Sequence, residues 1–202
     1  MDAVTPWYVP VARAVPAIAL AVVVTFSSDH SAPLGYITFG VFAVVAGSIL
    51  VASALRFTAR GVVRAVTLAQ GVVTALAGVV ALALPAGGLP FFVFLVTAFA
   101  AITGFLELYL GLRSRRSVSS ARDWIFVGGL TAVLAIALLL VPPGFTQSFT
   151  GPDGVERQLT ASIIVVGFLG AYWAILGVYL VIAGLSLKWS TDPAPVTPKV
   201  GA

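Results

Sequence analysis

The sequence predicts an all-α integral membrane protein with six transmembrane helices. Of its 202 residues, 60% are apolar and 9% are charged, whereas a soluble domain carries about 25% charged residues. Its apolar runs approach the roughly 20 residues that cross a bilayer, and short polar segments separate them. Continuous runs of this length favour helices over the short alternating strands of a membrane barrel. The predicted spans, in chain order, are Pro10–Ser27, Leu34–Leu55, Ala65–Leu84, Leu89–Leu112, Trp124–Val141 and Ala161–Leu187.

Basic residues gather in alternate joints between these spans. The joints after spans two and four contain Arg56, Arg60, Arg64, Arg113, Arg115, Arg116 and Arg122. The opposite joints contain only Arg157. Because basic residues concentrate on the cytoplasmic side, both termini and the arginine joints are predicted to be cytoplasmic. All of these joint arginines except Arg122 are also candidates to contact anionic lipid headgroups.

The chain is expected to form a single six-helix domain over residues 1–189. Residues 190–202 lack an apolar stripe and are predicted to be a flexible cytoplasmic tail. The longest outer joint, Pro142–Thr160, is rich in Gly, Pro and polar residues. That composition predicts an irregular loop.

An internal repeat relates the spans to one another. A shift of 57 residues places Gly71–Pro85 on Gly128–Pro142, with Gly, Thr, Ala and Pro at matching places. The same shift places Gly47 on Gly104, and a further shift of 73 residues places Gly104 on Gly177. Such self-similarity predicts a repeat architecture. Three helical hairpins, at about 8–56, 64–113 and 122–188, would then face the same way around a pseudo-threefold axis along the membrane normal.

Each span carries small residues spaced by seven, close to two helical turns. Such a stripe lets lipid-embedded helices approach one another closely. The glycines predicted to pack helices together are Gly40, Gly47, Gly71, Gly78, Gly104, Gly111, Gly128, Gly170, Gly177 and Gly184.

The odd spans follow the pattern G-x(6)-G-x(6)-P, complete at Gly71, Gly78 and Pro85, and span four ends in G-F-L-E-L-Y-L-G-L-R. In these features the chain resembles the HdeD-like family of small bacterial membrane proteins, named for an acid-resistance protein. The resemblance covers spans three to six, and spans one and two match more weakly. It implies a bacterial inner-membrane location and an association with stress or acid tolerance, and it brings no catalytic residues.

Glu107 is the only carboxylate inside a long apolar run. A charge in hydrocarbon costs roughly 2.5–3.5 kcal/mol on insertion scales, so Glu107 is expected to face protein or water. Gln70 should lie at similar depth, the 57-residue shift aligns Arg13 with Gln70, and Thr103 stands one turn before Glu107. These four residues are predicted to form a buried polar cluster near the cytoplasmic side. The alternative is that Glu107 reaches toward the headgroups, or pairs with one arginine only to orient helices.

Several kinds of chemistry lack the residues they need. The chain has no cysteine and one histidine, His30, in an outer joint. Thiol chemistry, Cys-based metal sites and a nucleophile–His–acid set inside the membrane are therefore excluded. An external His30 could sense acid, but a solvated loop residue is the simpler interpretation. Tyr172, Trp173 and Tyr179 are interpreted as packing residues, and no enzyme motif, catalytic residue, metal, cofactor or nucleic-acid partner is predicted.

The sequence is compatible with two main functions. The first is a non-catalytic membrane protein that acts by association, as a stress-tolerance protein, a homo-oligomer or an accessory subunit of a larger complex. The alternative is a small transporter or channel for protons or a weak acid that uses Glu107. An enzyme acting on lipid ranks last, because too few acid–base groups gather at one interface. A dry, packed centre would favour association, and a polar cavity lined by Glu107 would favour transport.

Overall fold

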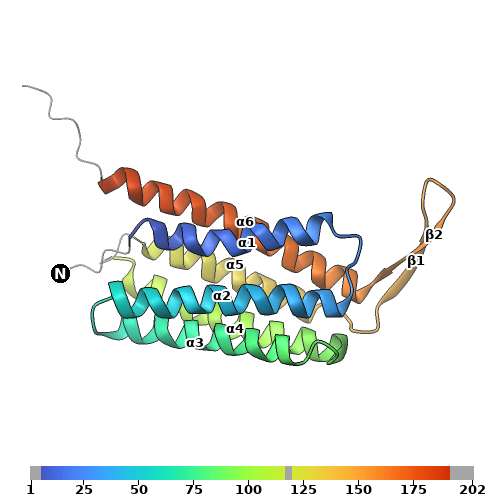
Figure 1. Ribbon diagram of the computed structural model, residues 1–202, viewed down its shortest axis with the longest axis horizontal. Helices are drawn as coiled ribbons and strands as arrows, with labels where there is room; N and C mark the ends of the chain where they lie inside the picture. The colour runs from blue at the N-terminus through green and yellow to red at the C-terminus, as the bar shows by residue number, and fades with distance from the viewer. Residues whose placement is uncertain (1–5, 117–119, 192–202) are drawn as a thin grey trace, which may run out of the picture.

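The computed structural model describes residues 6–116 and 120–191. Within these ranges it contains six long helices that run side by side and one two-stranded sheet that projects from one end (Figure 1). The elements are α1 (Tyr8–Phe26), α2 (Ala32–Phe57), α3 (Val62–Ala83), α4 (Gly88–Ser114), α5 (Ala121–Leu139), β1 (Thr146–Thr150), β2 (Glu156–Thr160) and α6 (Ala161–Thr191). The predicted tail begins inside α6, and its residues 192–202 lie outside the described ranges.

Each of these six helices is long and apolar enough to cross a bilayer. The chain is therefore a multi-pass membrane protein. The helix bounds lie within a few residues of the predicted spans, with the largest extension at the end of α6. The start of α1 and the two arginine joints lie at one end of the bundle, and the sheet lies at the other (Figure 1). The end that contains Arg56–Arg64 and Arg113–Arg122 is termed the arginine end.

Even-numbered helices lie toward the centre of the bundle. Inside the spans, α2, α4 and α6 are 50%, 39% and 50% buried, against 28%, 28% and 33% for α1, α3 and α5. The closest packing joins α2 to α3, α4 to α5 and α6 to α1. The two helices of each predicted hairpin, such as α3 and α4, also touch, but over fewer residues. Close packing therefore joins each predicted hairpin to the next one, rather than the two helices inside it.

Glycines make this close packing sterically possible. A Cβ atom added at Gly47 would lie 2.6 Å from the backbone nitrogen of Ala75, closer than real Cβ contacts. At Gly104 it would lie 3.0 Å from the nitrogen of Ala132, and at Gly177 3.2 Å from the nitrogen of Ile18. Ile18, Ala75 and Ala132 are successive positions of the 57-residue shift. The structure places all ten predicted packing glycines against a neighbouring helix of these three pairs.

The joint Pro142–Thr160 is not the irregular loop that its composition predicts. Strands β1 and β2 pair antiparallel, from Thr146 opposite Thr160 to Thr150 opposite Glu156. The turn between them contains P-D-G, a turn signal that the composition argument overlooked. Gly154 in this turn has a φ of +75°, which glycine adopts without steric cost. Every residue of β1 is exposed, so the sheet stands clear of the bundle.

Apolar side chains fill the half of the bundle nearer the sheet. Phe39, Phe92, Val96 and Leu138 have no exposed surface. The ring of Phe39 packs edge to face on Phe92 and on Phe99, with centroids 6.2 and 5.2 Å apart. Tyr36, which is also buried in this half, donates its hydroxyl to Gly88 O of α4 at 2.9 Å. The buried side chains of Gln70 and Glu107 lie in the half nearer the arginine end.

We expect Gly47→Leu to destabilise the fold by separating α2 from α3. Forcing extra atoms into a packed contact costs about 1–3 kcal/mol, so the free energy of unfolding should fall by that amount. Gly129→Ala in α5 is the matched control, because a Cβ there meets no atom within 4 Å. Reversible unfolding in mixed detergent micelles measures both variants. A Gly47→Leu protein as stable as the wild type would contradict the close helix contact.

The exposed sheet should respond to acid. Arg157 donates to both carboxylate oxygens of Asp153, at 2.9 and 2.7 Å. These bonds, with a further one from the Val155 N–H, hold the pKa of Asp153 below its usual range. A lowered pKa means that Asp153 stabilises the turn above the unfolded pKa of about 3.9, and that this contribution is lost as the pH falls through the folded pKa.

The Gly151 amide, which donates to Val155 O at 2.9 Å, reports on this turn. Its NMR shift should move below about pH 4 and stay constant over the same range in Asp153→Asn. A shift that titrates equally in the variant would show that Asp153 is not the responsible group.

Candidate functional site

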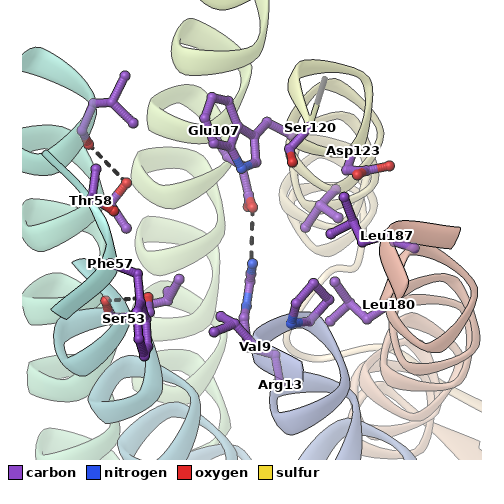
Figure 2. A pocket seen from close by; sticks show the side chains of 17 residues that line it. Val9, Arg13, Ser53, Phe57, Thr58, Glu107, Ser120, Asp123, Leu180 and Leu187 are labelled. Carbon is purple, nitrogen blue, oxygen red and sulfur yellow. Dashed lines mark hydrogen bonds and ion pairs between the residues drawn. The ribbon is translucent and has the colours of Figure 1, made fainter. Parts of the chain in front are cut away.

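Glu107 is held by side chains from two neighbouring helices. Its Oε1 accepts a hydrogen bond from Arg13 Nη2 of α1 at 3.4 Å, which is also an ion pair. Its Oε2 accepts from Gln70 Nε2 of α3 at 3.0 Å. The Glu107 side chain is 4% exposed and that of Arg13 is 15% exposed. Figure 2 shows Arg13 and Glu107 pointing toward one another. The structure thus brings together three of the four residues of the predicted cluster.

Thr103, the fourth residue of the predicted cluster, makes no hydrogen bond to Glu107. Its hydroxyl donates to Phe99 O of its own helix at 2.7 Å. Threonine inside a helix commonly bonds the carbonyl four residues earlier, and this local bond uses the hydroxyl proton. Thr103 still lines a small cavity beside Glu107.

The cluster interrupts an otherwise apolar pattern. Leu50 and Leu180 occupy the positions of Glu107 in the other two repeats, and Val127 occupies that of Arg13 and Gln70. A buried carboxylate is tolerated only where charge and hydrogen bonds compensate it. Arg13 and Gln70 supply that compensation from helices α1 and α3, on either side of the central helices.

A partly enclosed cavity of about 100 Å³ reaches the ion pair from the arginine end. Its rim includes Thr58, Val63 and Ser120, which lie at the helix ends joined by the arginine joints. Arg13 and Glu107 also line it, as Figure 2 shows. This cavity is termed the vestibule. It is large enough for several water molecules, each of which needs about 10–15 Å³ by the same measure.

A second cavity of about 20 Å³ lies deeper in the bundle. Arg13, Leu50, Glu107 and Leu180 line both cavities and therefore form the boundary between them. The inner cavity has room for about one water molecule. Its remaining polar lining comes from Gln70, Thr74, Thr103, Thr131 and Tyr172.

Asp123 adds a second carboxylate to the vestibule. It lies in the first turn of α5, and its Oδ1 accepts a hydrogen bond from the Tyr179 hydroxyl of α6 at 2.8 Å. The Tyr179 ring stacks on Phe126 with centroids 3.9 Å apart. This contact fixes the hydroxyl that orients the carboxylate. Among the described residues that line the two cavities, the charged ones are Arg13, Glu107 and Asp123.

The sequence interpretation missed the polar roles of Asp123, Thr131, Tyr172 and Tyr179. The Tyr172 hydroxyl lies 3.1 Å from Thr131 Oγ1 beside the inner cavity. Tyr172 is therefore more than a packing residue, whereas Trp173 is fully buried and packs on Phe42. A signal for Tyr172 existed, because the repeat aligns it with Phe42 and Phe99 and only Tyr172 carries a hydroxyl.

The other predicted site residues lie away from the cluster. Arg56, Arg60, Arg113, Arg115 and Arg116 are exposed at the arginine end, and Arg64 is half-buried. The Arg113 guanidinium donates to the Tyr109 hydroxyl at 3.3 Å. His30 lies in the α1–α2 joint at the opposite end of the bundle. In the part of the chain that the structure describes, no three His, Asp or Glu side chains are grouped to hold a metal ion.

A sequence model of a short repeat of unknown function (DUF308) matches residues 69–141. The match contains α4 and α5 with most of α3, and it therefore includes Gln70, Glu107 and Thr131. The chain matches no curated protein and no solved structure. These comparisons and the six apolar helices indicate a membrane protein, part of which is similar to a short repeat of unknown function.

Breaking the ion pair from one side should cost more than replacing both partners. In Arg13→Val the carboxylate of Glu107 keeps only Gln70, and loss of one partner of a buried pair costs about 3–5 kcal/mol. The double variant Arg13→Val/Glu107→Leu uses the residues found at equivalent positions, Val127 and Leu50. It should recover most of that loss. Unfolding free energies of the wild type, Arg13→Val, Glu107→Leu and the double variant give the coupling energy between the two residues. Strictly additive losses would contradict a direct pair.

Proposed function

We propose that the protein is a non-catalytic membrane carrier in which Glu107 binds a proton that arrives from the arginine end. The observation that carries this proposal is the vestibule, because it connects the arginine end to a carboxylate at membrane depth. Buried ionisable groups in membrane spans commonly mark ion or proton pathways. A polar cavity lined by Glu107 favours transport over association as the main function.

The charges around the vestibule favour a proton over the anion of a weak acid. Two carboxylates, Glu107 and Asp123, face one cation, Arg13. The arginine joints at the mouth would attract an anion, but inside the vestibule it would meet a surplus of negative charge, and like charges in a cavity of low dielectric repel strongly. A proton instead removes the charge of Glu107 and weakens its ion pair with Arg13.

Access from one side only supports a carrier and not an open pore. Beyond the inner cavity, fully buried side chains such as Phe39, Phe92 and Val96 fill the bundle. Release on the other side therefore requires a second conformation. Protonation of Glu107 supplies a reason for the change, because it removes the electrostatic attraction that holds α1 to α4.

We also infer the arrangement of three like-facing repeats about an axis along the membrane normal. Its support is the recurrence of the glycine contacts at Gly47, Gly104 and Gly177. The inner cavity adds further support, because its lining includes the matching positions Phe42, Phe99 and Tyr172. Similarity to the HdeD-like family and the gathering of arginines at one end support a bacterial inner-membrane location with cytoplasmic termini.

Association with a partner is the second candidate function. The sheet β1–β2 projects from the bundle and contains only these two strands, so its outer edges are free to accept a strand. A role as an accessory subunit, or in stress or acid tolerance, would use this surface. The packing glycines do not support it, because they face neighbouring helices of the same chain.

Proton flux into liposomes tests the carrier. Purified protein is reconstituted with an internal pH-sensitive dye, and a valinomycin-clamped potassium gradient drives proton entry. The wild type should acidify the lumen faster than protein-free liposomes, and Glu107→Gln should reduce the protein-dependent rate at least tenfold because its amide cannot bind the proton. Glu156→Gln in β2 is the matched control, because it makes the same change outside the cavities.

Two results would contradict the proposal. One is wild-type flux equal to that of empty liposomes. The other is acidification that appears only when acetate is supplied outside and that exceeds the passive entry of acetic acid into protein-free liposomes, which would identify a weak acid as the substrate. Native size-exclusion profiles of each variant establish that a lost rate is not a lost fold.

A further inference from the structure

A groove runs along the outer surface between α2 and α3, apart from the cavities of the Glu107 cluster. Its volume is about 480 Å³, within the roughly 300–1,000 Å³ typical of ligand sites. On α2 it is bordered by Ser48, Ala52 and Arg56, and on α3 by Val72, Ala75 and Leu76. The three residues on α2 are spaced by four, so they follow one face of the helix for about 12 Å.

The groove exists because the backbones are close and the side chains above them are small. Gly47 and Gly71 bring α2 and α3 together, with a Cβ at Gly47 only 2.7 Å from Gly71 O. Ala52 and Ala75 then leave space on the outer surface, where larger side chains would fill the groove between the two helices. Ser48 adds no free donor, because its hydroxyl donates to Val44 O at 2.7 Å. The floor of the groove is therefore apolar.

One end of the groove is cationic. Arg56 lies in the last turn of α2 and is exposed. A guanidinium at the end of a membrane helix lies at headgroup level, where it attracts anionic lipids. The planar fork of arginine also matches the oxygens of a phosphate group. An apolar groove about 12 Å long with a phosphate-binding end is complementary to a phospholipid.

We propose that this groove binds one acyl chain of an anionic phospholipid, whose headgroup phosphate contacts Arg56. The groove opens on the apolar surface of a membrane protein, so lipid is the ligand that surrounds it. The acyl chain covers the exposed parts of Ala52 and Leu76. The positive charge of Arg56 selects an anionic headgroup over a zwitterionic one.

The equivalent face of α4 and α5 has larger side chains on its α4 side and supplies the matched control. The 57-residue shift takes Ser48, Ala52 and Arg56 to Phe105, Tyr109 and Arg113. Phe105 and Tyr109 are large, and the Tyr109 hydroxyl accepts a bond from Arg113. Arg113 therefore has the same charge and the same position in its helix, but aromatic side chains take the places of Ser48 and Ala52 beside it.

Native mass spectrometry of the detergent-solubilised protein with added phosphatidylglycerol or phosphatidylcholine tests the proposal. The wild type should retain one phosphatidylglycerol at least fivefold better than phosphatidylcholine. Arg56→Gln should abolish this preference, and Arg113→Gln should preserve it. Ala52→Phe, which fills the groove at an exposed position, should reduce retention of both lipids.

Each other outcome overturns the proposal. Equal loss in Arg56→Gln and Arg113→Gln would indicate general attraction to the arginine end. Unchanged retention in Ala52→Phe would show that the acyl chain does not occupy the groove. Equal binding of the two lipids by the wild type would show that Arg56 selects no headgroup. Thermal unfolding of each variant in detergent verifies that it is folded.

Discussion

Close backbone contact between helices is the constraint on which the rest of this structure depends. Lipid tails are as apolar as the helices, so the hydrophobic effect does little to draw one span onto another. Close packing between the helices must therefore hold the spans together. In this chain it is made possible by glycines such as Gly47, Gly104 and Gly177, at each of which an added Cβ would lie 2.6–3.2 Å from the nearest backbone nitrogen of the facing helix. These contacts hold α3, α5 and α1 against the more central α2, α4 and α6, and they thereby decide which side chains face inward.

The inward positions explain why one carboxylate can be kept at membrane depth. Glu107 lies on α4, a central helix, and the odd helices on either side present Arg13 and Gln70 to its two oxygens. Leucine occupies the matching positions of the other two repeats, so only one of the three repeats has a charged residue there. A buried ion pair adds little to stability when compared with an apolar replacement. The pair therefore fits the carrier proposed above, which needs a titratable group within reach of water.

The same close packing creates two different environments. Between the helices at the arginine end, diverging helix ends leave the vestibule, in which the surplus of carboxylates favours a cationic occupant. On the outer surface, the small residues above the α2–α3 contact leave a groove whose only charged border is Arg56. The vestibule contains the ion pair between Arg13 and Glu107. The groove has the cation Arg56 at the end that faces the headgroups. Bulkier residues at the matching places on α4, namely Phe105 and Tyr109, show how a change of side-chain size alone distinguishes one repeat from another.

Properties that depend on runs of residues were determined by the sequence alone. Span length and hydropathy specified the six helices, and the 57-residue shift located the small residues at which they meet. The depth of Glu107 in its span pointed to Gln70, and the 57-residue shift pointed to Arg13; the structure places both within hydrogen-bond distance of Glu107. Only the tertiary structure decided that the close pairs join neighbouring hairpins, that Thr103 bonds its own helix, and that Asp123 and Tyr172 line the cavities. Those outcomes depend on the rotation of each helix about its axis and on which neighbour it faces. Spacing along a single helix does not specify either, because in lipid an apolar residue is acceptable on every face.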